Sequence, residues 1–171
     1  MNYFLTTQRI GFGVWTKDDF EKARLLWLNP NVTKYISATG TFSLQQVSDR
    51  FELEIANQEK YQVQYWPIYL LENDEFIGCC GLRPYDLDNN IYEFGIHLID
   101  KYWNCGYAKE AGSKVIDYAF ETLKVANLFA GHNPKNTVSK KMLEKLGFNY
   151  FKDEYYEPTG LNHPSYLMKK M

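Results

Sequence analysis

The sequence predicts a mixed α/β (α+β) fold in which helices flank a β-sheet. Two patterns support this prediction: short apolar or alternating runs typical of strands, and apolar residues at intervals of three and four typical of amphipathic helices. The expected strands and helices follow one another along the chain in the order β-α-α-β-β-β-α-β-α-β-β. No internal repeat, linker or low-complexity tract separates them, so residues 1–171 are expected to form a single domain.

Composition narrows the class of protein. With 171 residues, of which 45% are hydrophobic and 17% aromatic, the chain can bury a core and is not expected to be disordered. Its net charge of −2 gives no basic surface for nucleic acid or anionic lipid. No apolar run is long enough to span a bilayer and no signal pattern opens the chain, which favours a soluble, cytoplasmic protein.

The three cysteines predict neither a disulfide framework nor a metal site. Cys79, Cys80 and Cys105 form no C-x-x-C pair and have no histidine at ligand spacing. A reducing compartment fits this usage. Cys79 and Cys80 lie in an apolar run and are expected in the core. Cys105 precedes a helix, but no base lies near it in sequence, so a nucleophilic role is not expected.

Signals in the first third of the chain predict one strand and two helices. Arg9–Trp15 is expected to be the first strand. Thr16 can cap the helix that follows, which Asn29 and Pro30 should end. A loop then leads to Ser43, a suitable cap for the second helix.

Three strands are expected in the middle of the chain. They are Trp66–Leu71, Phe76–Leu82 and Ile91–Ile99, with a hairpin turn at Asn73-Asp74 between the first two. Alternation along the third strand separates apolar side chains from polar or small ones. The two sets are Tyr92, Phe94, Ile96 and Leu98, and Glu93, Gly95 and His97. The apolar face should pack on the next helix, and Gly95 should mark a bulge or a close backbone approach.

The last third alternates helices and strands. Helices are expected at Tyr107 to about Lys124 and at Asn136–Leu146, the second ended by Gly147. Strands are expected at Asn127–Ala130, Tyr150–Glu154 and Ser165–Lys169.

The segment Asp100–Ala111 joins the third of the middle strands to the helix that begins near Tyr107. A helix start leaves several backbone N–H groups without partners, and the positive end of the helix dipole lies behind them. Gly106 and Ala108 lack bulk, so a pyrophosphate could approach the backbone closely there. This segment therefore predicts a phosphate-binding loop, although many ordinary strand-to-helix turns also contain glycine.

Two segments together resemble the GCN5-related N-acetyltransferase (GNAT) superfamily. Asp100–Ala111 is similar to its acetyl-CoA signature, Arg/Gln-x-x-Gly-x-Gly/Ala. Asn136-x-x-Ser139 followed by Glu144–Phe148 is similar to its second signature, Asn-x-x-Ser/Ala with Glu-Lys-x-Gly-Phe. The form Tyr-Trp-x-x-Gly-Tyr-Ala resembles most closely the branch of ribosomal-protein N-terminal alanine acetyltransferases.

The resemblance implies both a fold and an activity. The fold would be a mostly antiparallel sheet flanked by helices with a splayed central strand pair, in which the first two helices line the acceptor groove. The activity would be transfer of an acetyl group from acetyl-CoA to a primary amine by direct attack in a ternary complex, in a monomer or homodimer. The alternative is a CoA-binding sensor or partner-binding module that has lost catalysis. A doubly wound nucleotide-binding fold is disfavoured because the loop lacks G-x-G-x-x-G.

The resemblance also implies a set of residues that hold acetyl-CoA. They are Leu98, Ile99, Trp103, Asn104, Cys105, Gly106, Tyr107, Ala108, Lys109, Asn136 and Ser139. Trp103 stands where the signature usually has Arg or Gln, so phosphate binding would depend on backbone amides. Lys101 or Lys109 could assist as point charges.

Acetyl transfer to an amine requires a base and a proton donor for the leaving thiolate. The resemblance places Glu93 as the base, acting directly or through a water; the alternative is an exposed strand glutamate paired with a cation. His97 would assist it or be structural. The tyrosine that often protonates the thiolate is replaced by Leu143. The thiolate would then be protonated by water, by Ser139 or by a tyrosine from elsewhere such as Tyr150, or would leave without being protonated.

The acceptor is the least defined part of the prediction. Asp153–Gly160 combines carboxylates with aromatic rings, which would attract a cationic amine or would simply form a solvated hairpin rim. A protein N-terminus, a polyamine and an amino-sugar antibiotic all remain open as acceptors.

Overall fold

The computed structural model describes residues 1–171, and eight strands form one sheet in the order β1-β2-β3-β4-β5-β6-β8-β7. The strands are β1 (Leu5–Thr6), β2 (Ile10–Phe12), β3 (Tyr65–Leu70), β4 (Phe76–Asp86), β5 (Ile91–Leu98), β6 (Asn127–Gly131), β7 (Asn149–Tyr156) and β8 (Leu161–Lys169). Neighbouring strands are antiparallel except β5 and β6, which are parallel. The mixed, mostly antiparallel sheet confirms the predicted fold class.

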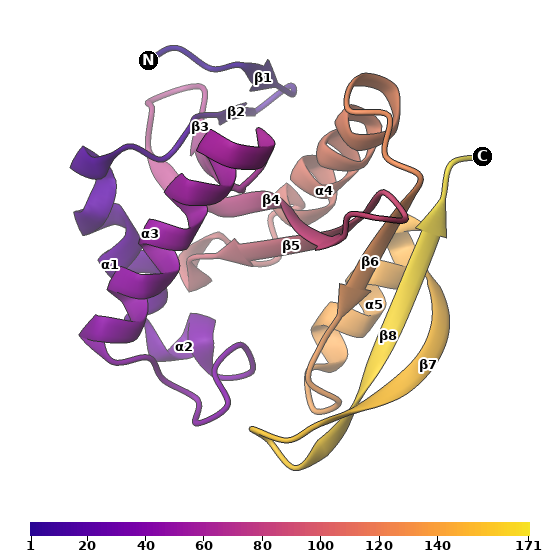
Figure 1. Cartoon of the computed structure of the whole chain (residues 1–171). Helices are drawn as coiled ribbons and strands as arrows, with labels where there is room; N and C mark the ends of the chain where they lie inside the picture. Colours follow the sequence, from indigo (N-terminus) through magenta and orange to yellow (C-terminus); the bar gives the residue numbers. More distant parts are fainter.

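Helices cover both faces of this sheet (Figure 1). One face carries α1 (Phe20–Trp27), α2 (Pro30–Thr33) and α3 (Leu44–Tyr61), and the other carries α4 (Tyr107–Asp117) and α5 (Thr137–Leu146). Short helical turns occur at Lys17–Asp19, Asp100–Tyr102 and Tyr118–Thr122, the last a π-helical continuation of α4. None of the helices is long and apolar enough to cross a membrane.

The sheet opens between its two parallel strands. β5 and β6 pair only from Ile91 to Glu93, after which they separate. Ile99 donates its N–H to Ile77 of β4 (3.0 Å), and successive strand residues point their amides to opposite sides. The amides of Ile96 and Leu98, which lie beyond the last paired residues, therefore point toward the opening, where no strand pairs with them. This is the splayed pair that the family resemblance implies.

The apolar face of β5 packs on α4, as predicted. The Phe94 ring lies so close to Gly112 of α4 that a Cβ there would be 3.2 Å from it. Phe94 also contacts Phe148, with ring centroids 5.5 Å apart. Gly147, with φ +98°, ends α5 in the left-handed conformation and turns the chain so that Phe148 enters the core.

The predicted caps at Ser43, Asn136 and Gly147 are confirmed, whereas Thr16 precedes the short turn Lys17–Asp19 and Asp19 is the N-cap residue of α1. Several boundaries also differ. Ser43 accepts from the Gln46 amide (3.2 Å) at the start of α3. The Asn29 side chain accepts from the Asn31 amide (3.0 Å), and Pro30 begins α2 instead of ending the helical region. A proline is favourable at a first helical position because the N–H it lacks would be unpaired there.

Other differences concern strands. The short strand β1 was not predicted, because two residues carry no periodic signal. β4 continues to Asp86, so the segment from Pro84 that was expected to be a polar connection is mostly strand. β7 and β8 likewise extend toward their turn, which places Asp153–Tyr156 in a strand and leaves only Glu157–Gly160 as the turn.

Candidate active site

The start of α4 presents a continuous run of unpaired backbone amides. No N–H group from Asn104 to Lys109 is bonded to an acceptor in the protein; Glu110, the next residue, donates to the Gly106 carbonyl (3.1 Å). Gly106 is the N-cap residue and provides no side-chain cap. With the positive end of the helix dipole behind these amides, the loop can bind an anion through its backbone.

The conformation of this loop depends on two left-handed residues and one tryptophan. Asn104 has φ +61° and Gly106 has φ +82°. Trp103 donates its indole N–H to the Leu98 carbonyl (2.9 Å), which fixes the loop to the end of β5. Its side chain is 45% exposed, so Trp103 is not a core residue, which was one of the two interpretations of its sequence position.

A cation also lies over the loop, contributed by the start of the chain. Arg9 donates to the Cys105 carbonyl (3.1 Å), and its guanidinium lies 4.4 Å from the centroid of the Tyr107 ring. It also pairs with Glu110 of α4 (2.7 Å). Partial burial opposes ionisation of Glu110, but hydrogen bonds from Thr7 and Arg9 outweigh it and lower the pKa of this carboxyl. Arg9 could not be predicted as a site residue, because no local pattern in the sequence connects it to a loop so far along the chain.

The two lysines predicted to assist have different surroundings. Lys101 pairs with Glu75 (2.6 Å), which reduces its availability to an anion. Lys109 is exposed and forms no ion pair with the protein. Cys105 is exposed, and its thiol donates to the Trp103 carbonyl (3.4 Å).

The second signature forms the start of α5. The Asn136 side chain accepts from the Ser139 amide (3.1 Å), so it caps the helix as one interpretation of the sequence required. The half-buried Ser139 hydroxyl has no hydrogen-bond partner in the protein. Leu143 is buried in the core at 3% exposure, and Tyr150 is 60% exposed on β7.

On the opposite face of β5, Glu93 contacts a buried tyrosine. The Tyr65 hydroxyl donates to Glu93 (2.8 Å), and no cation forms an ion pair with this half-buried carboxylate. Glu93 is therefore not an exposed glutamate paired with a cation, which was the alternative interpretation of its position. Gly95 provides the close approach that was predicted, because a Cβ there would overlap the Tyr65 ring.

His97 lies farther along the same face and is held by aromatic residues. Its Nδ1 accepts from the Trp27 indole N–H (3.1 Å), and its ring packs edge-on against Tyr65. Burial, with smaller contributions from Arg50 and Arg83, lowers its pKa well below the usual 6.5. His97 is therefore neutral at physiological pH, with its proton on Nε2, and it has a structural role in the packing of this face.

Two arginines and a fully buried glutamate complete this face. Glu54 of α3 accepts from Arg83 of β4 (Nε to Oε1, 2.8 Å) and from the Tyr65 amide (2.7 Å). Arg50, one turn earlier on α3, lies beside them. Sequence analysis missed this set, although Arg50 and Glu54 fall at helical spacing from Val47 and Phe51 on the apolar side of α3, where charged residues are unusual.

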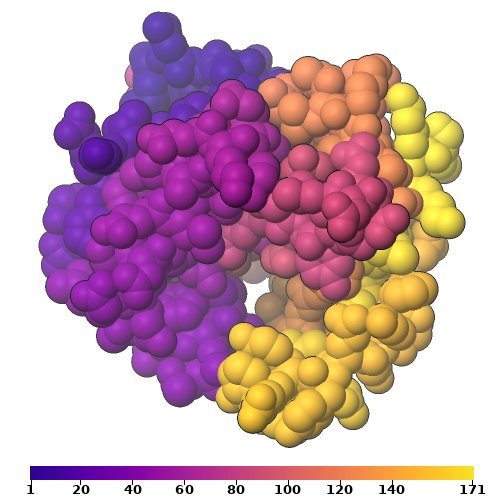
Figure 2. Space-filling view, in the orientation of Figure 1, coloured from indigo at the N-terminus to yellow at the C-terminus, as the bar shows by residue number.

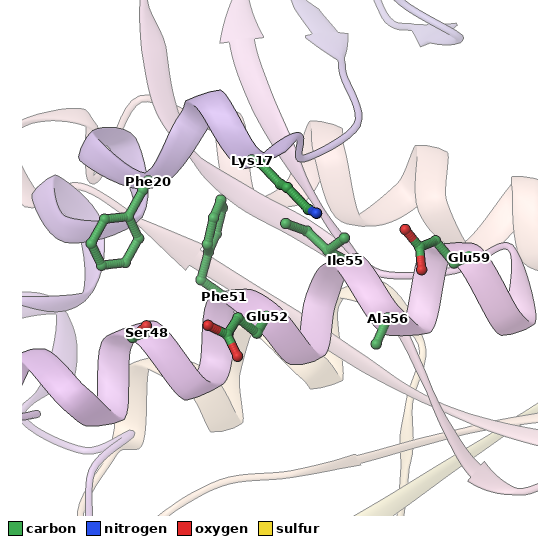
Figure 3. A pocket seen from close by; sticks show the side chains of 8 residues that line it. All are labelled: Lys17, Phe20, Ser48, Phe51, Glu52, Ile55, Ala56 and Glu59. Carbon is green, nitrogen blue, oxygen red and sulfur yellow. The ribbon is translucent and has the colours of Figure 1, made fainter.

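The surface above this face is hollowed. Figure 2 shows a depression between the purple α2–α3 segment, the rose β4–β5 hairpin and the yellow β7–β8 hairpin. A groove of about 580 Å³ elsewhere on the surface lies between α1 and α3 and is lined by Lys17, Phe20, Phe51 and Ile55 among others (Figure 3). None of its lining residues belongs to β5, the α4 loop or α5, so it is not the candidate active site.

The start of α4 can bind an anion and lies beside the opening between β5 and β6, and the Glu93 carboxylate lies on the other face of β5. This arrangement is suited to holding an activated acyl donor next to a nucleophile. A family model described as an acetyltransferase (GNAT) domain matches residues 9–149. The chain belongs to the GNAT acetyltransferase family. The reaction of this family is acetyl-CoA-dependent acetylation of amines, so the protein is an acyltransferase and the predicted superfamily is confirmed.

Relatives and solved structures agree with this assignment. This GNAT acetyltransferase is 33% identical over 144 residues to the uncharacterized N-acetyltransferase p20 of Bacillus licheniformis, covering 84% of this chain and 81% of the relative. An acetyltransferase structure from Agrobacterium tumefaciens is 25% identical with a TM-score of 0.82, covering 99% of this chain and 98% of that one. RimL, a ribosomal L7/L12 α-N-protein acetyltransferase in complex with coenzyme A, is 10% identical with a TM-score of 0.80 and 95% coverage of both chains.

Proposed function

We propose that this protein binds acetyl-CoA at the start of α4 and transfers its acetyl group to a primary amine, a protein N-terminus or a small molecule, by direct attack in a ternary complex. The observation that carries the proposal is the run of unbonded amides from Asn104 to Lys109 beside the opening between β5 and β6. These amides would hold the pyrophosphate, with Trp103 and Cys105–Ala108 shaping the loop.

The pantetheine arm would lie in the opening of the sheet. The free amides of Ile96 and Leu98 are the available donors, and one of them would polarise the thioester carbonyl. Ile99 was also expected to contribute, but its amide donates to Ile77, so only its carbonyl or side chain could do so. Asn136 and Ser139 would border the arm from α5.

Glu93 would act as the base, either directly or through a water. The amine nitrogen attacks the thioester carbonyl carbon and loses a proton to Glu93, whose position Tyr65 fixes. The carbon–sulfur bond then breaks, and the thiolate takes a proton from Ser139 or from water. Leu143 cannot donate a proton, and the Ser139 hydroxyl is not engaged elsewhere.

The organisation and location of the protein are also part of the proposal. One continuous eight-stranded sheet supports a single acetyltransferase domain over residues 1–171. Three free cysteines, two of them buried, support a reducing cytoplasmic environment.

Calorimetric titration with acetyl-CoA, beside ATP and NAD as controls, tests the cofactor site. The proposal predicts binding of acetyl-CoA alone, followed by acetylation of one or more members of a panel of primary amines when the complex is supplied with them. Binding without acetylation of any amine would support a CoA-binding sensor module instead. Absence of acetyl-CoA binding would contradict the proposed function.

A further inference from the structure

Arg50 is a cation without an ionic partner in the protein. It lies on the sheet-facing side of α3 and is half-buried, yet its guanidinium forms no hydrogen bond or salt bridge with any residue. None of its nitrogens is sealed from solvent. The guanidinium instead lies near two aromatic rings, 4.9 Å from the Phe42 centroid and 5.5 Å from that of Trp27.

The carboxylates nearest to Arg50 are already occupied. Both oxygens of Glu54 are used, Oε1 by Arg83 and Oε2 by the Tyr65 amide. Glu93 accepts from the Tyr65 hydroxyl. Partial burial of a guanidinium costs free energy unless its N–H groups form hydrogen bonds, and cation–π contacts replace only part of the lost hydration. The N–H groups of Arg50 are therefore free to bind an anion that enters from solvent.

The position of Arg50 relative to Glu93 defines where that anion would lie. Arg50 packs on Trp27, whose indole contacts His97, and burial together with Arg50 lowers the pKa of His97. His97 is four residues from Glu93 on the same face of β5, about 13 Å along the strand. Arg50, near His97, and Glu93 thus lie toward two ends of the face of β5 that carries the proposed base.

We propose that the acceptor is a primary amine that also carries a carboxylate, with the amine at Glu93 and the carboxylate at Arg50. This inference depends on the proposed acetyltransferase function and specifies its substrate class. A short peptide-like acceptor could bridge the two groups, because an extended dipeptide or tripeptide places its carboxylate on the order of 7–10 Å from its amine and the side chains of Arg50 and Glu93 are long enough to span the rest. A polyamine has no group for Arg50 and would bring a second cation toward it.

The test compares acceptors that differ only in this charge. Alanine di- and tripeptides are supplied as free acids and as C-terminal carboxamides, because the peptide bonds between the two ends keep the amine pKa values similar. The wild-type enzyme should prefer the acids by about 10- to 100-fold in kcat/KM, mainly through KM, as expected for charge-assisted hydrogen bonds. The preference should weaken as salt is raised.

Two variants test whether Arg50 causes the preference. Arg50→Gln should remove it, and Arg50→Lys should keep only part, since an ammonium lacks the planar fork of a guanidinium. Arg24→Gln is the matched control: Arg24 is also half-buried, but it is paired with Glu21 of its own helix (2.8 Å), so this substitution should leave the preference unchanged. The ratio of acid to carboxamide within each variant is insensitive to the fraction of folded enzyme.

Each other outcome overturns the inference. A wild-type enzyme that prefers carboxamides, that treats both equally, or that acetylates polyamines but neither peptide would show that the acceptor needs no carboxylate. If Arg50→Gln lowered kcat/KM equally for acids and carboxamides, the role of Arg50 would be in packing alone. In all these cases binding of acetyl-CoA would persist and the proposed acetyltransferase function would stand, whereas failure to bind acetyl-CoA would contradict both.

Discussion

The two faces of β5 carry sites of different construction. On the side of α4, the proposed acetyl-CoA site consists mainly of backbone amides from one continuous loop, Asn104–Lys109. On the side of α3, the proposed acceptor site consists of side chains that come from four separate segments. These side chains are Arg50 and Glu54, Tyr65, Arg83, and Glu93 with His97.

The difference determines how each site responds to substitution. A site of backbone amides tolerates changes of side chain as long as the loop keeps its conformation, so the loss of the usual Arg or Gln at Trp103 does not remove it. A site of buried, mutually bonded side chains depends on each member, because removing one leaves its partner without a hydrogen bond. Substitutions of single side chains should therefore be tolerated better in the α4 loop than among the bonded side chains on the α3 side.

The largest effect on the α3 side is expected from the base. Glu93→Gln should lower kcat by about 10² to 10⁴, the usual contribution of a general base, while acetyl-CoA affinity is unchanged. Tyr65→Phe, which removes only the donor to Glu93, should cost about tenfold. Single-turnover kinetics between pH 6 and 9 would measure both. The base assignment would be wrong if Glu93→Gln retained wild-type turnover across this range.

The buried ion pair should affect stability more than chemistry. Glu54→Ala leaves Arg83 and the Tyr65 amide unpaired in a buried setting, which should lower the free energy of unfolding by about 3–5 kcal/mol. The free energy of unfolding should fall less in the double variant Glu54→Ala/Arg83→Met than in Glu54→Ala alone, because no uncompensated buried charge remains. Urea denaturation of the three proteins measures this. A single variant within about 1 kcal/mol of wild type would show that the pair is not required.

On the α4 side, conformation should matter more than side-chain identity. Gly106→Val should weaken acetyl-CoA binding by about 100-fold or more, because φ +82° is unfavourable for a β-branched residue and a shifted loop would misplace several charge-assisted hydrogen bonds. Gly160→Val is the control: Gly160 has φ +67° and open space around it, but lies in the distant β7–β8 turn. Equal acetyl-CoA affinity of Gly106→Val and wild type would remove the loop from the binding site.

The smallest predicted effect is a pH dependence of stability. The pKa of buried His97 is held below 6.5, so at pH below about 6.5 the unfolded chain binds a proton that the folded chain does not. The free energy of unfolding should therefore be fully retained above this pH and fall as pH drops, with a slope of up to about 1.4 kcal/mol per pH unit. Denaturation between pH 5 and 8 should show a flatter profile for His97→Asn. If the free energy of unfolding had the same slope with pH in wild type and in His97→Asn, His97 would not be the buried neutral group described here.

The features predicted correctly from the sequence are likewise those that depend on neighbouring residues. The strand at Ile91–Leu98, the loop before Tyr107, and the caps at Ser43, Asn136 and Gly147 each depend on neighbouring residues, and they were predicted. β1 and α2 were not, because segments of two and four residues are too short for periodicity to show. Element ends such as that of β4 depend on pairing with a partner strand, which a local pattern does not contain.

The side chains of the two sites were predicted unequally for the same reason. Gly106 and Ser139 belong to local signatures. Arg9 reaches Cys105 and Arg83 reaches Glu54 only after the chain has folded, and no spacing in the sequence links the members of either pair. The one available signal, charged residues on the apolar side of α3, indicates buried charge but not which strand supplies the partner.

The most direct test of the cofactor site is an NMR titration of isotope-labelled protein with acetyl-CoA, observing backbone amides. The largest shifts are expected at the amides of Asn104–Lys109 and at Ile96 and Leu98, whose N–H groups have no partner in the protein. Little change is expected along the groove between α1 and α3. Shifts absent from Asn104–Lys109, or centred on that groove, would contradict a cofactor site built from the backbone at the start of α4.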